Sequence, residues 1–368
     1  MIKKILVDNG SGVVKAGNYD EEFPSLCEPT IGGTLEVRNE ETGRPTTQLF
    51  GTQAFESRLT VPLKYPIKRG IIIDFDLMDS IWDAAVDPLQ ENNDNHIQVV
   101  MTESTTNTQA KRIITANHVF HEVYADSFYL GASPLMAMYG ENMSTGLVID
   151  SGDGITECVP IVDGKIIRNA VTSSSFGGSD ITTHLMKLYD TVEDTTLDFF
   201  EKKNSVQRMK EEMCYITLDI NKERTKNEGK EHVYRLPDGK YLNVGEEVFQ
   251  APEALFQPRL IGSSSDSIPL LALKAINQVK ESDRKEMYTN ILLVGGNTLF
   301  QGFKERLQFE LERLAPNETI KITSAHHGIN SAWLGLKVIS SIETFSNLTI
   351  TRDDYQENGD DAMKAKFK

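Results

Sequence analysis

The chain has 368 residues, of which 39% are hydrophobic and 25% are charged, and its formal net charge at pH 7 is −16. A chain of this length exceeds what one compact core accommodates, so we expect two domains of an ordinary globular protein. The acidic balance argues against nucleic acid or an anionic membrane surface as a partner. No apolar run approaches the roughly 20 residues that cross a bilayer, so membrane insertion is not expected. An expected strand begins so early that it leaves no room for a signal peptide.

The cysteine and histidine positions argue against the common small metal sites and disulfide frameworks. Cys27, Cys158 and Cys214 are scattered and have no CxxC spacing, which favours a reducing compartment. His326 and His327 are the only histidines adjacent in the sequence, and neighbouring side chains on a strand or loop usually diverge. We therefore expect the protein in the cytoplasm or the nucleus.

The first half of the chain contains a hairpin, a polar loop and then helices alternating with a buried strand. In chain order these are a β-hairpin at 3–20, a mobile polar loop at 32–52, a helix at 77–89, a strand at 97–104 ending in Thr and Glu, and a helix at 108–125. A further apolar segment follows at 126–140.

The second half restarts the same pattern. The order is strand-turn-strand-turn-strand at 146–171, helices at 179–189 and 205–219, a strand, Gly-Gly turn and long helix at 290–314, and a last helix at 330–345. The tail from Asp353 is charged, and we expect it to be loosely held. Two similar halves predict an α/β fold built from two duplicated domains.

Each half opens with a glycine-rich turn after an aspartate. Glycines in such a turn let consecutive backbone N–H groups converge on an anion. The expected donors are Gly10, Ser11, Gly12 and Val13 in the first turn and Gly152, Asp153, Gly154 and Ile155 in the second. Lys15 follows the first turn on the second strand of the hairpin, and its ammonium group would place a positive charge next to a bound phosphate.

Asp8 and Asp150 precede the two turns. Two carboxylates near a polyphosphate need a divalent cation between them, and Mg²⁺ keeps most of its water, so we expect water-mediated metal contacts. The alternative is that each motif is only a hairpin turn, because Asp-Gly and Asn-Gly are common turn dipeptides. Two matching hairpins with a third glycine turn at 295–296 favour a phosphate site over that alternative.

Six segments resemble the actin family in order and spacing, from Asp8 to about Tyr355. They are "DNGSGVVKAG", "LKYPIKRGIIIDFD", "IDSGDGIT", "LPDGK", "PEALFQP" and "LLVGGNTLFQG". "PEALFQP" and "LKYP" are specific to actins and actin-related proteins, whereas the phosphate hairpins alone are also typical of Hsp70-like chaperones and sugar kinases. The chain resembles a divergent actin or actin-related protein.

The resemblance implies an actin-like ATPase fold of two duplicated domains and four subdomains, with ATP or ADP and Mg²⁺ or Ca²⁺ in a central cleft. The implied first domain is 1–137 with 331–368, including a subdomain 2 insertion at about 29–65. The second is 138–330, with subdomain 4 at about 177–263. The residues implied to surround ribose and adenine are Gly178, Asp180, Lys210, Glu211, Gly295, Gly296, Asn297, Leu299 and Phe300. Without the resemblance, "MKEEMCY" around Lys210 reads as an ordinary amphipathic helix.

Two departures from the family concern hydrolysis. Actins position the attacking water with a glutamine and a histidine, and the matching positions here are Ser133 and Glu157. Ser133 is shorter and would reach the water only through another solvent molecule. Glu157 can accept a proton but adds a negative charge near the γ-phosphate, so we expect slow or altered hydrolysis. The alternative is that Glu157 faces solvent or pairs with a lysine.

Other departures concern the base and the filament. Ile329 replaces a base-contacting lysine, and Arg69 replaces a family histidine. The loop "TLEVRNEETGRPTTQ" is polar and acidic, and "GSSSDSIP" is rich in serine, where filament contacts use apolar anchors.

Three functions therefore remain open. The first is a nucleotide-gated cytoskeletal subunit that binds itself in filaments and binds actin-binding proteins, in the cytoplasm and cytoskeleton. The second is a non-polymerising scaffold of a larger complex, and the third is a small-molecule kinase.

Overall fold

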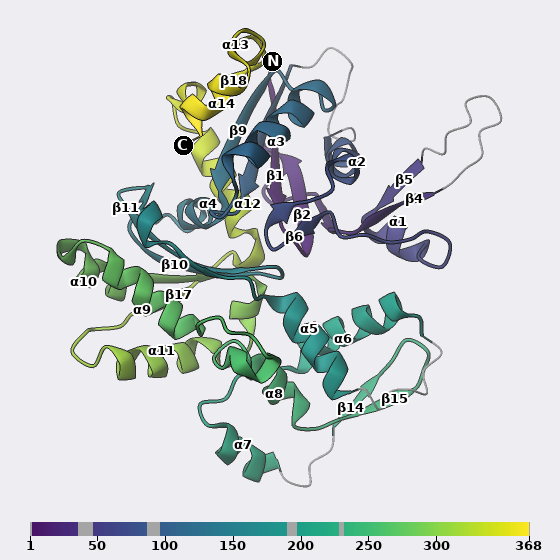
Figure 1. Ribbon diagram of the computed structural model, residues 1–368, viewed down its shortest axis with the longest axis vertical. Coiled ribbons are helices and arrows are strands. Elements are labelled where there is room, and N and C mark those ends of the chain that lie inside the picture. The colour runs from purple at the N-terminus through teal and green to yellow at the C-terminus, as the bar shows by residue number, and fades with distance from the viewer. Residues whose placement is uncertain (1, 36–46, 87–95, 190–196, 228–231, 368) are drawn as a thin grey trace. The chain divides into compact units, whose positions relative to one another are not determined.

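A computed structural model describes residues 2–35, 47–86, 96–189, 197–227 and 232–367. It has the expected mixed α/β architecture (Figure 1). The chain divides into two compact units, one formed by Met1–Ser144 with Ile329–Lys368 and the other by Thr145–Gly328. The functional domain and subdomain ranges expected above stay predictions. The acidic part of the polar loop, residues 36–46, lies outside the described residues.

The first unit is built on a six-stranded sheet in the order β18-β9-β8-β1-β2-β3. Its strands are β1 (Lys3–Asn9), β2 (Val13–Asn18), β3 (Leu26–Pro29), β8 (Ile97–Glu103), β9 (Ser127–Ala132) and β18 (Ile350–Thr351). Two small strand pairs complete it: β4 (Gly32–Leu35) with β5 (Thr47–Phe50), and β6 (Ile67–Lys68) with β7 (Ile71–Ile72). Strands β1, β8 and β9 are parallel, and β2 returns antiparallel to β1.

The helices of the first unit are α1 (Gly51–Glu56), α2 (Phe75–Val86), α3 (Gln109–His121), α4 (Ser133–Gly140), α12 (Ser331–Ser340), α13 (Arg352–Asn358) and α14 (Asp360–Lys366), with the 3-10 turns η5 (Gly328–Asn330) and η6 (Phe345–Asn347) beside α12. Helix α12 packs closely on α4, because Gly335 and Gly140 let the two backbones approach. Its Trp333 is fully buried and donates its indole N–H to the carbonyl oxygen of Leu6 at 3.1 Å. The late segment of the chain therefore completes the core of the N-terminal sheet.

The second unit repeats this plan. Its sheet has the order β12-β11-β10-β16-β17, and β13 also pairs with β11. The strands are β10 (Gly146–Ser151), β11 (Thr156–Val162), β12 (Lys165–Ile166), β13 (Thr172–Ser174), β16 (Ile291–Val294) and β17 (Ile322–Ser324), and β14 (His232–Arg235) pairs separately with β15 (Tyr241–Val244). As β1 does, β10 has an antiparallel hairpin partner on one side and a parallel strand on the other. This equivalence confirms the duplication that the sequence indicates.

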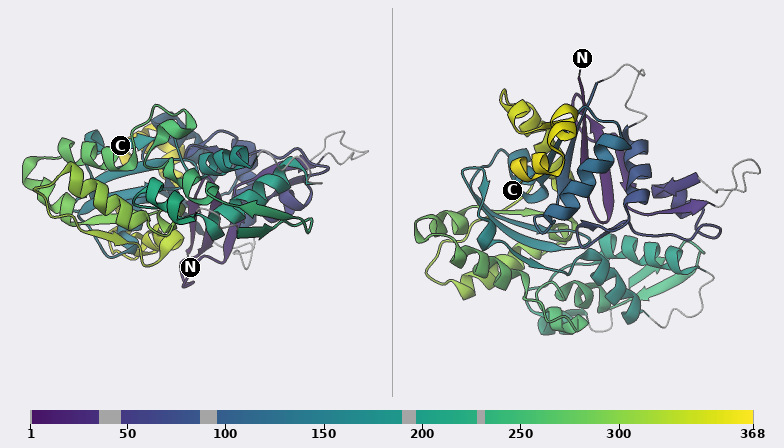
Figure 2. Two further views of the ribbon diagram at one scale, coloured as in Figure 1. Left: turned by 90° about the horizontal axis from the view of Figure 1, so that it is seen from below. Right: turned by 45° about the horizontal axis from the view of Figure 1, so that its top comes forward.

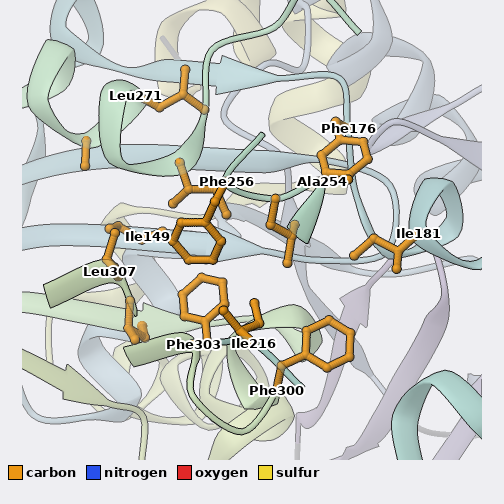
Figure 3. Close-up of a cluster of buried hydrophobic side chains, with 14 of the residues drawn as sticks. Ile149, Phe176, Ile181, Ile216, Ala254, Phe256, Leu271, Phe300, Phe303 and Leu307 are labelled. Atoms are coloured by element: carbon orange, nitrogen blue, oxygen red, sulfur yellow. The ribbon is translucent and has the colours of Figure 1, made fainter. Parts of the chain in front are cut away.

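The helices of the second unit are α5 (Gly178–Leu188), α6 (Phe199–Met213), α7 (Ile220–Asn227), α8 (Glu247–Glu253), α9 (Ile268–Gln278), α10 (Glu281–Thr289) and α11 (Phe303–Leu314), with 3-10 turns η2 (Arg168–Ala170), η3 (Pro258–Ile261) and η4 (Gly296–Leu299). Figure 3 shows part of the core that they enclose, which includes Ile149 of β10 and in which the rings of Phe256 and Phe303 have centroids 5.5 Å apart. Burial of such side chains contributes roughly 1.5–3 kcal/mol each. This apolar packing holds β10, the strand that carries Asp150, in place.

Three local expectations were wrong. Residues 32–35 and 47–50 form a strand pair where a loop was expected. Helix α6 ends at Met213 rather than near residue 219, because Cys214 is extended, with a ψ of 145°, and Tyr215 pairs with Gln301.

The tail is not loosely held either. It forms α13 and α14, yellow in Figure 2, which contact β18, and α14 also contacts α3. Tyr355 stacks on Phe120 with ring centroids 4.8 Å apart, and Met363 is fully buried.

Candidate functional site

The first candidate turn connects β1 to β2, and its acidic residue is neutralised locally. Asp8 faces Lys15 across the hairpin, and Lys15 Nζ lies 2.7 Å from Asp8 Oδ2. Thr102, at the end of β8, donates its hydroxyl to Asp8 Oδ1 at 2.7 Å. Both carboxylate oxygens of this buried aspartate thus have a protein donor, which fixes the direction in which the carboxylate presents its remaining lone pairs.

The backbone of the first turn is held from three sides. The amide of Gly10 donates within the turn, to the carbonyl oxygen of Asp8 at 3.2 Å. Thr30 donates its hydroxyl to the carbonyl oxygen of Gly10 at 2.7 Å, and its amide donates to Gly12 O at 3.0 Å. The hydroxyl of Ser11 accepts the amide of Gly70 at 3.0 Å. Hydrogen bonds from Thr30 and Gly70 therefore support the conformation of this loop.

The second candidate turn connects β10 to β11, and its charge arrangement is the reverse of the first. Asp150 stands opposite Glu157 in the antiparallel ladder, in the place where the first hairpin has Asp8 opposite Lys15. On its other side Glu157 faces Ser173 of β13. Glu157 has an exposed fraction of only 2%, so it does not face solvent. Paired residues of an antiparallel ladder lie on one face of the sheet, so the two carboxylates are neighbours.

The loop Gly152–Ile155 is tied to the start of α5. The amide of Gly152 donates to Ile155 O at 3.0 Å, which closes the turn. The carbonyl oxygens of Gly152 and Asp153 accept the amides of Gly178 and Ser179, each at 3.0 Å. These two amides belong to the first turn of α5, whose N-terminus carries the partial positive charge of the helix dipole. The loop and the helix start therefore form one unit.

Lys210 reaches this helix start from α6. Its buried ammonium donates to the carbonyl oxygen of Gly178 at 3.1 Å. Burial lowers the pKa of Lys210, although Asp153 works in the opposite direction, and burial raises the pKa of Asp153 against the pull of Lys210 and Lys203. A Cβ atom on Gly178 would lie 2.9 Å from Asn297 Oδ1 and 3.2 Å from Lys210 Nζ, so only glycine leaves this polar space open.

The other residues expected near ribose and adenine divide into two groups. Gly295 has a φ of +86° and turns the chain against Ser151 O, so the turn after β16 does approach the second loop. Asn297 reaches that loop directly, and its side-chain nitrogen lies 2.8 Å from Gly152 O. Gly296 begins the same 3-10 turn, η4. Leu299 is 60% exposed.

Three side chains of that set make their described contacts elsewhere within their own unit. Phe300 packs into the apolar core, as Figure 3 shows. Asp180 caps α5 by accepting the amide of Gly177 at 2.9 Å. Glu211 is exposed and accepts from Gln207 at 3.1 Å on the same helix. Their assignment to a nucleotide stays a prediction.

Three other residues named as departures, Ser133, Ile329 and Arg69, lie in the first unit, whereas Glu157 lies in the second. Ser133 is half-buried and opens α4, with Pro134 next to it in the first turn. Ile329 is 43% exposed. Arg69 has a φ of +54° in the turn between β6 and β7, next to the Gly70 that donates to Ser11.

The donor chemistry fits a divalent cation held largely through water. Over the described part of the chain, no three His, Cys, Asp or Glu side chains are grouped so that they could hold a metal ion. Asp8 and Asp150 each present a carboxylate at the end of a strand, and oxygen donors of this kind suit Mg²⁺ or Ca²⁺.

Among the described residues, no helix has the length and apolar character to cross a membrane.

Residues that support the two turns were missed from the sequence. Thr102 and Thr30 act in the first turn, while Ser151 and Thr156 join their hydroxyls under the second at 2.9 Å. Thr102 ends a strand that was predicted, and a polar residue closing an apolar run beside the Asp8 strand is the signal that could have found it.

Comparison with known protein families gives a match that covers the whole chain. The family model described as Actin matches residues 1–368.

Proposed function

The chain belongs to the actin family, and on that premise we propose that it is an ATP-binding cytoskeletal subunit that assembles into filaments according to its nucleotide. Nucleotide state changes the affinity between subunits, and a head-to-tail interface extends the polymer. The proposal includes the cytoplasm and cytoskeleton as location, with the nucleus open, and actin-binding proteins as partners.

The observation that carries this proposal is the pair of equivalent hairpins, one in each unit. Each presents an aspartate at the end of a strand and a glycine turn directly after it. In the proposal, both turns hold the phosphates of ATP, and Asp8 and Asp150 orient the water shell of a bound Mg²⁺ or Ca²⁺. The cation supplies charge neutralisation for the phosphates when it is bound.

We further propose that hydrolysis is slow or altered. Ser133 has a short side chain at the start of α4, and Glu157 is a buried carboxylate beside Asp150. Neither side chain can take over the role of the glutamine amide and the histidine imidazole that orient the attacking water in the family. A carboxylate also disfavours the negative charge that develops nearby in the transition state.

Phosphate release tests this step. Wild type should release phosphate slowly, and the double variant Ser133→Gln/Glu157→His should release it faster at equal ATP occupancy. Glu246→Gln, an exposed change on another part of the chain, serves as the control and should match wild type. A wild type that releases phosphate as fast as conventional actin contradicts the proposal.

The second candidate is a non-polymerising scaffold that binds ATP structurally, and the buried Glu157 also favours it. Sedimentation with Mg-ATP separates the two candidates. A pellet whose amount depends on nucleotide supports the filament, and no pellet at any concentration or salt supports the scaffold. ADP production that requires glucose or glycerol would instead identify a small-molecule kinase.

A further inference from the structure

Asn297 is a buried amide in the turn after β16, and its position serves the second glycine loop. It has an exposed fraction of 4%. Its side-chain nitrogen donates to the carbonyl oxygen of Gly152 at 2.8 Å and to Ser151 Oγ at 3.1 Å. Both N–H groups of the amide are therefore directed at the end of β10 and the start of the loop.

The carbonyl oxygen of Gly152 receives a second donor, the amide of Gly178 at 3.0 Å. A carbonyl oxygen has two lone pairs, so Asn297 and Gly178 together occupy both. In a trans peptide the C=O and the following N–H point in opposite directions, and the chain has no cis peptide bond among its described residues. The two hydrogen bonds to Gly152 O fix the plane of the Gly152–Asp153 peptide. They therefore also fix the direction of the N–H of Asp153, which is one of the predicted phosphate donors.

The surroundings keep the amide in one orientation. Ser151 Oγ is shared with Thr156 Oγ1 at 2.9 Å, and Thr156 donates on to Phe176 O at 3.0 Å. On the opposite side, Asn297 Oδ1 lies next to Gly178, the residue at which an added Cβ would approach it to 2.9 Å. A residue with a different shape or a reversed hydrogen-bond pattern would not satisfy these partners together.

We propose that Asn297 is a positioning residue that fixes the Gly152–Asp153 peptide and thereby sets affinity for the phosphates of a nucleotide, rather than a residue that binds the base. The proposal rests on the proposed nucleotide binding. In this proposal Asn297 positions the loop, whereas Leu299, which is exposed in the same turn, does not.

The test compares the binding of Mg-ATP and of adenosine by calorimetry. Asn297→Asp keeps the shape but replaces the donor with an acceptor facing Gly152 O, and Asn297→Ala removes both bonds. We expect each to weaken Mg-ATP binding about tenfold or more, the equivalent of one or two lost hydrogen bonds, and to change adenosine binding less than about twofold.

The matched control is Thr298→Val, because the hydroxyl of Thr298 donates to Gly295 O at 2.8 Å inside the same turn and does not reach the loop. It should leave the ratio of the two affinities unchanged. Equal losses for Mg-ATP and adenosine, or no loss in either Asn297 variant, overturn the proposal.

A second measurement does not depend on nucleotide. Amide hydrogen exchange of the segment 150–155 in the protein without nucleotide should quicken about tenfold in both Asn297 variants and stay as in wild type in Thr298→Val. If wild type binds neither Mg-ATP nor adenosine, the proposed function fails, while this exchange still decides whether Asn297 holds the loop. Unchanged exchange in both variants refutes the positioning role.

Discussion

Asp150 and Glu157 face each other across the β10–β11 hairpin, at the point where Asp8 and Lys15 face each other in the equivalent hairpin of the other unit. One hairpin therefore carries an ion pair with Lys15 Nζ 2.7 Å from Asp8 Oδ2, and its counterpart carries two acids. A like-charge pair directly opposite in a ladder is destabilising. The two hairpins thus share one pairing geometry and differ in the sign of one charge.

Replacing Glu157 by Gln should stabilise the protein without nucleotide. It removes one of two facing carboxylates, and cross-strand charge pairs are worth about 0.2–1 kcal/mol. Thermal unfolding in the presence of a chelator measures the shift, expected to be upward by about 1–4 °C. Glu211→Gln, an exposed change on α6, should leave the midpoint unchanged. A lower midpoint for Glu157→Gln would show that the carboxylate is stabilising where it stands.

Thr102→Val should loosen the first turn. The substitution leaves Asp8 Oδ1 without its donor and the amide of Asn9 without its acceptor, which now lie at 2.7 and 2.9 Å from the hydroxyl. Losing the partner of a buried polar group costs about 1–3 kcal/mol, measured as the free energy of unfolding in urea. Thr102→Ser keeps the hydroxyl and should recover most of the loss. If serine and valine variants are equally destabilised, the hydroxyl is not the cause.

Glu253→Gln should destabilise the second unit strongly. Arg306 forms two parallel bonds to Glu253, at 2.9 and 3.0 Å, and both side chains are buried. The substitution leaves Arg306 with Glu310, 2.8 Å from its Nε, as its ion-pair partner, so the loss should exceed about 1 kcal/mol and stay below about 3–5 kcal/mol, the cost of a fully uncompensated buried charge. The matched control is Glu246→Gln in the exposed pair with Arg224, which should cost at most about 1 kcal/mol. Similar losses of unfolding free energy in the two variants would contradict the role of burial.

Cysteine alkylation should distinguish the three thiols. Cys27 is exposed, and Cys158 and Cys214 are buried. Burial raises the pKa of Cys214 to about 12, against a smaller lowering by Lys210, so the reactive thiolate appears only as the pH rises toward that value. Between pH 7 and 9, iodoacetamide should modify Cys27 first and Cys214 only after denaturation. Rapid labelling of Cys214 in native protein at pH 8 would disprove this.

The strands and turns that build the candidate site could be predicted because their signals are local. Both hairpins combine alternating β-branched residues with a glycine turn, and they form where they were expected. The partners of these turns are not local. Thr102 lies 94 residues from Asp8 and reaches it only because β8 pairs with β1.

Errors arose where a few apolar residues outweigh the polarity of a segment. In the tail from Asp353, Tyr355, Met363 and Phe367 are buried although most residues around them are charged. Phe300 is a different case: its place in a family motif assigns it to a ligand, its ring packs in the core, and the assignment stays a prediction. A sequence motif identifies the segment, whereas packing decides which side chains of the segment remain available.

The first unit is assembled from two distant parts of the chain, and this has a consequence for its synthesis. Trp333 and β18 belong to the last forty or so residues, yet they close the core against Leu6 and extend the sheet beside β9. A ribosome releases them after the whole second unit, so the N-terminal sheet still has an uncovered apolar face at the stage when the second unit is complete. Nascent chains arrested with residues 1–328 outside the exit tunnel should therefore show a protease-resistant C-terminal half and a sensitive N-terminal one.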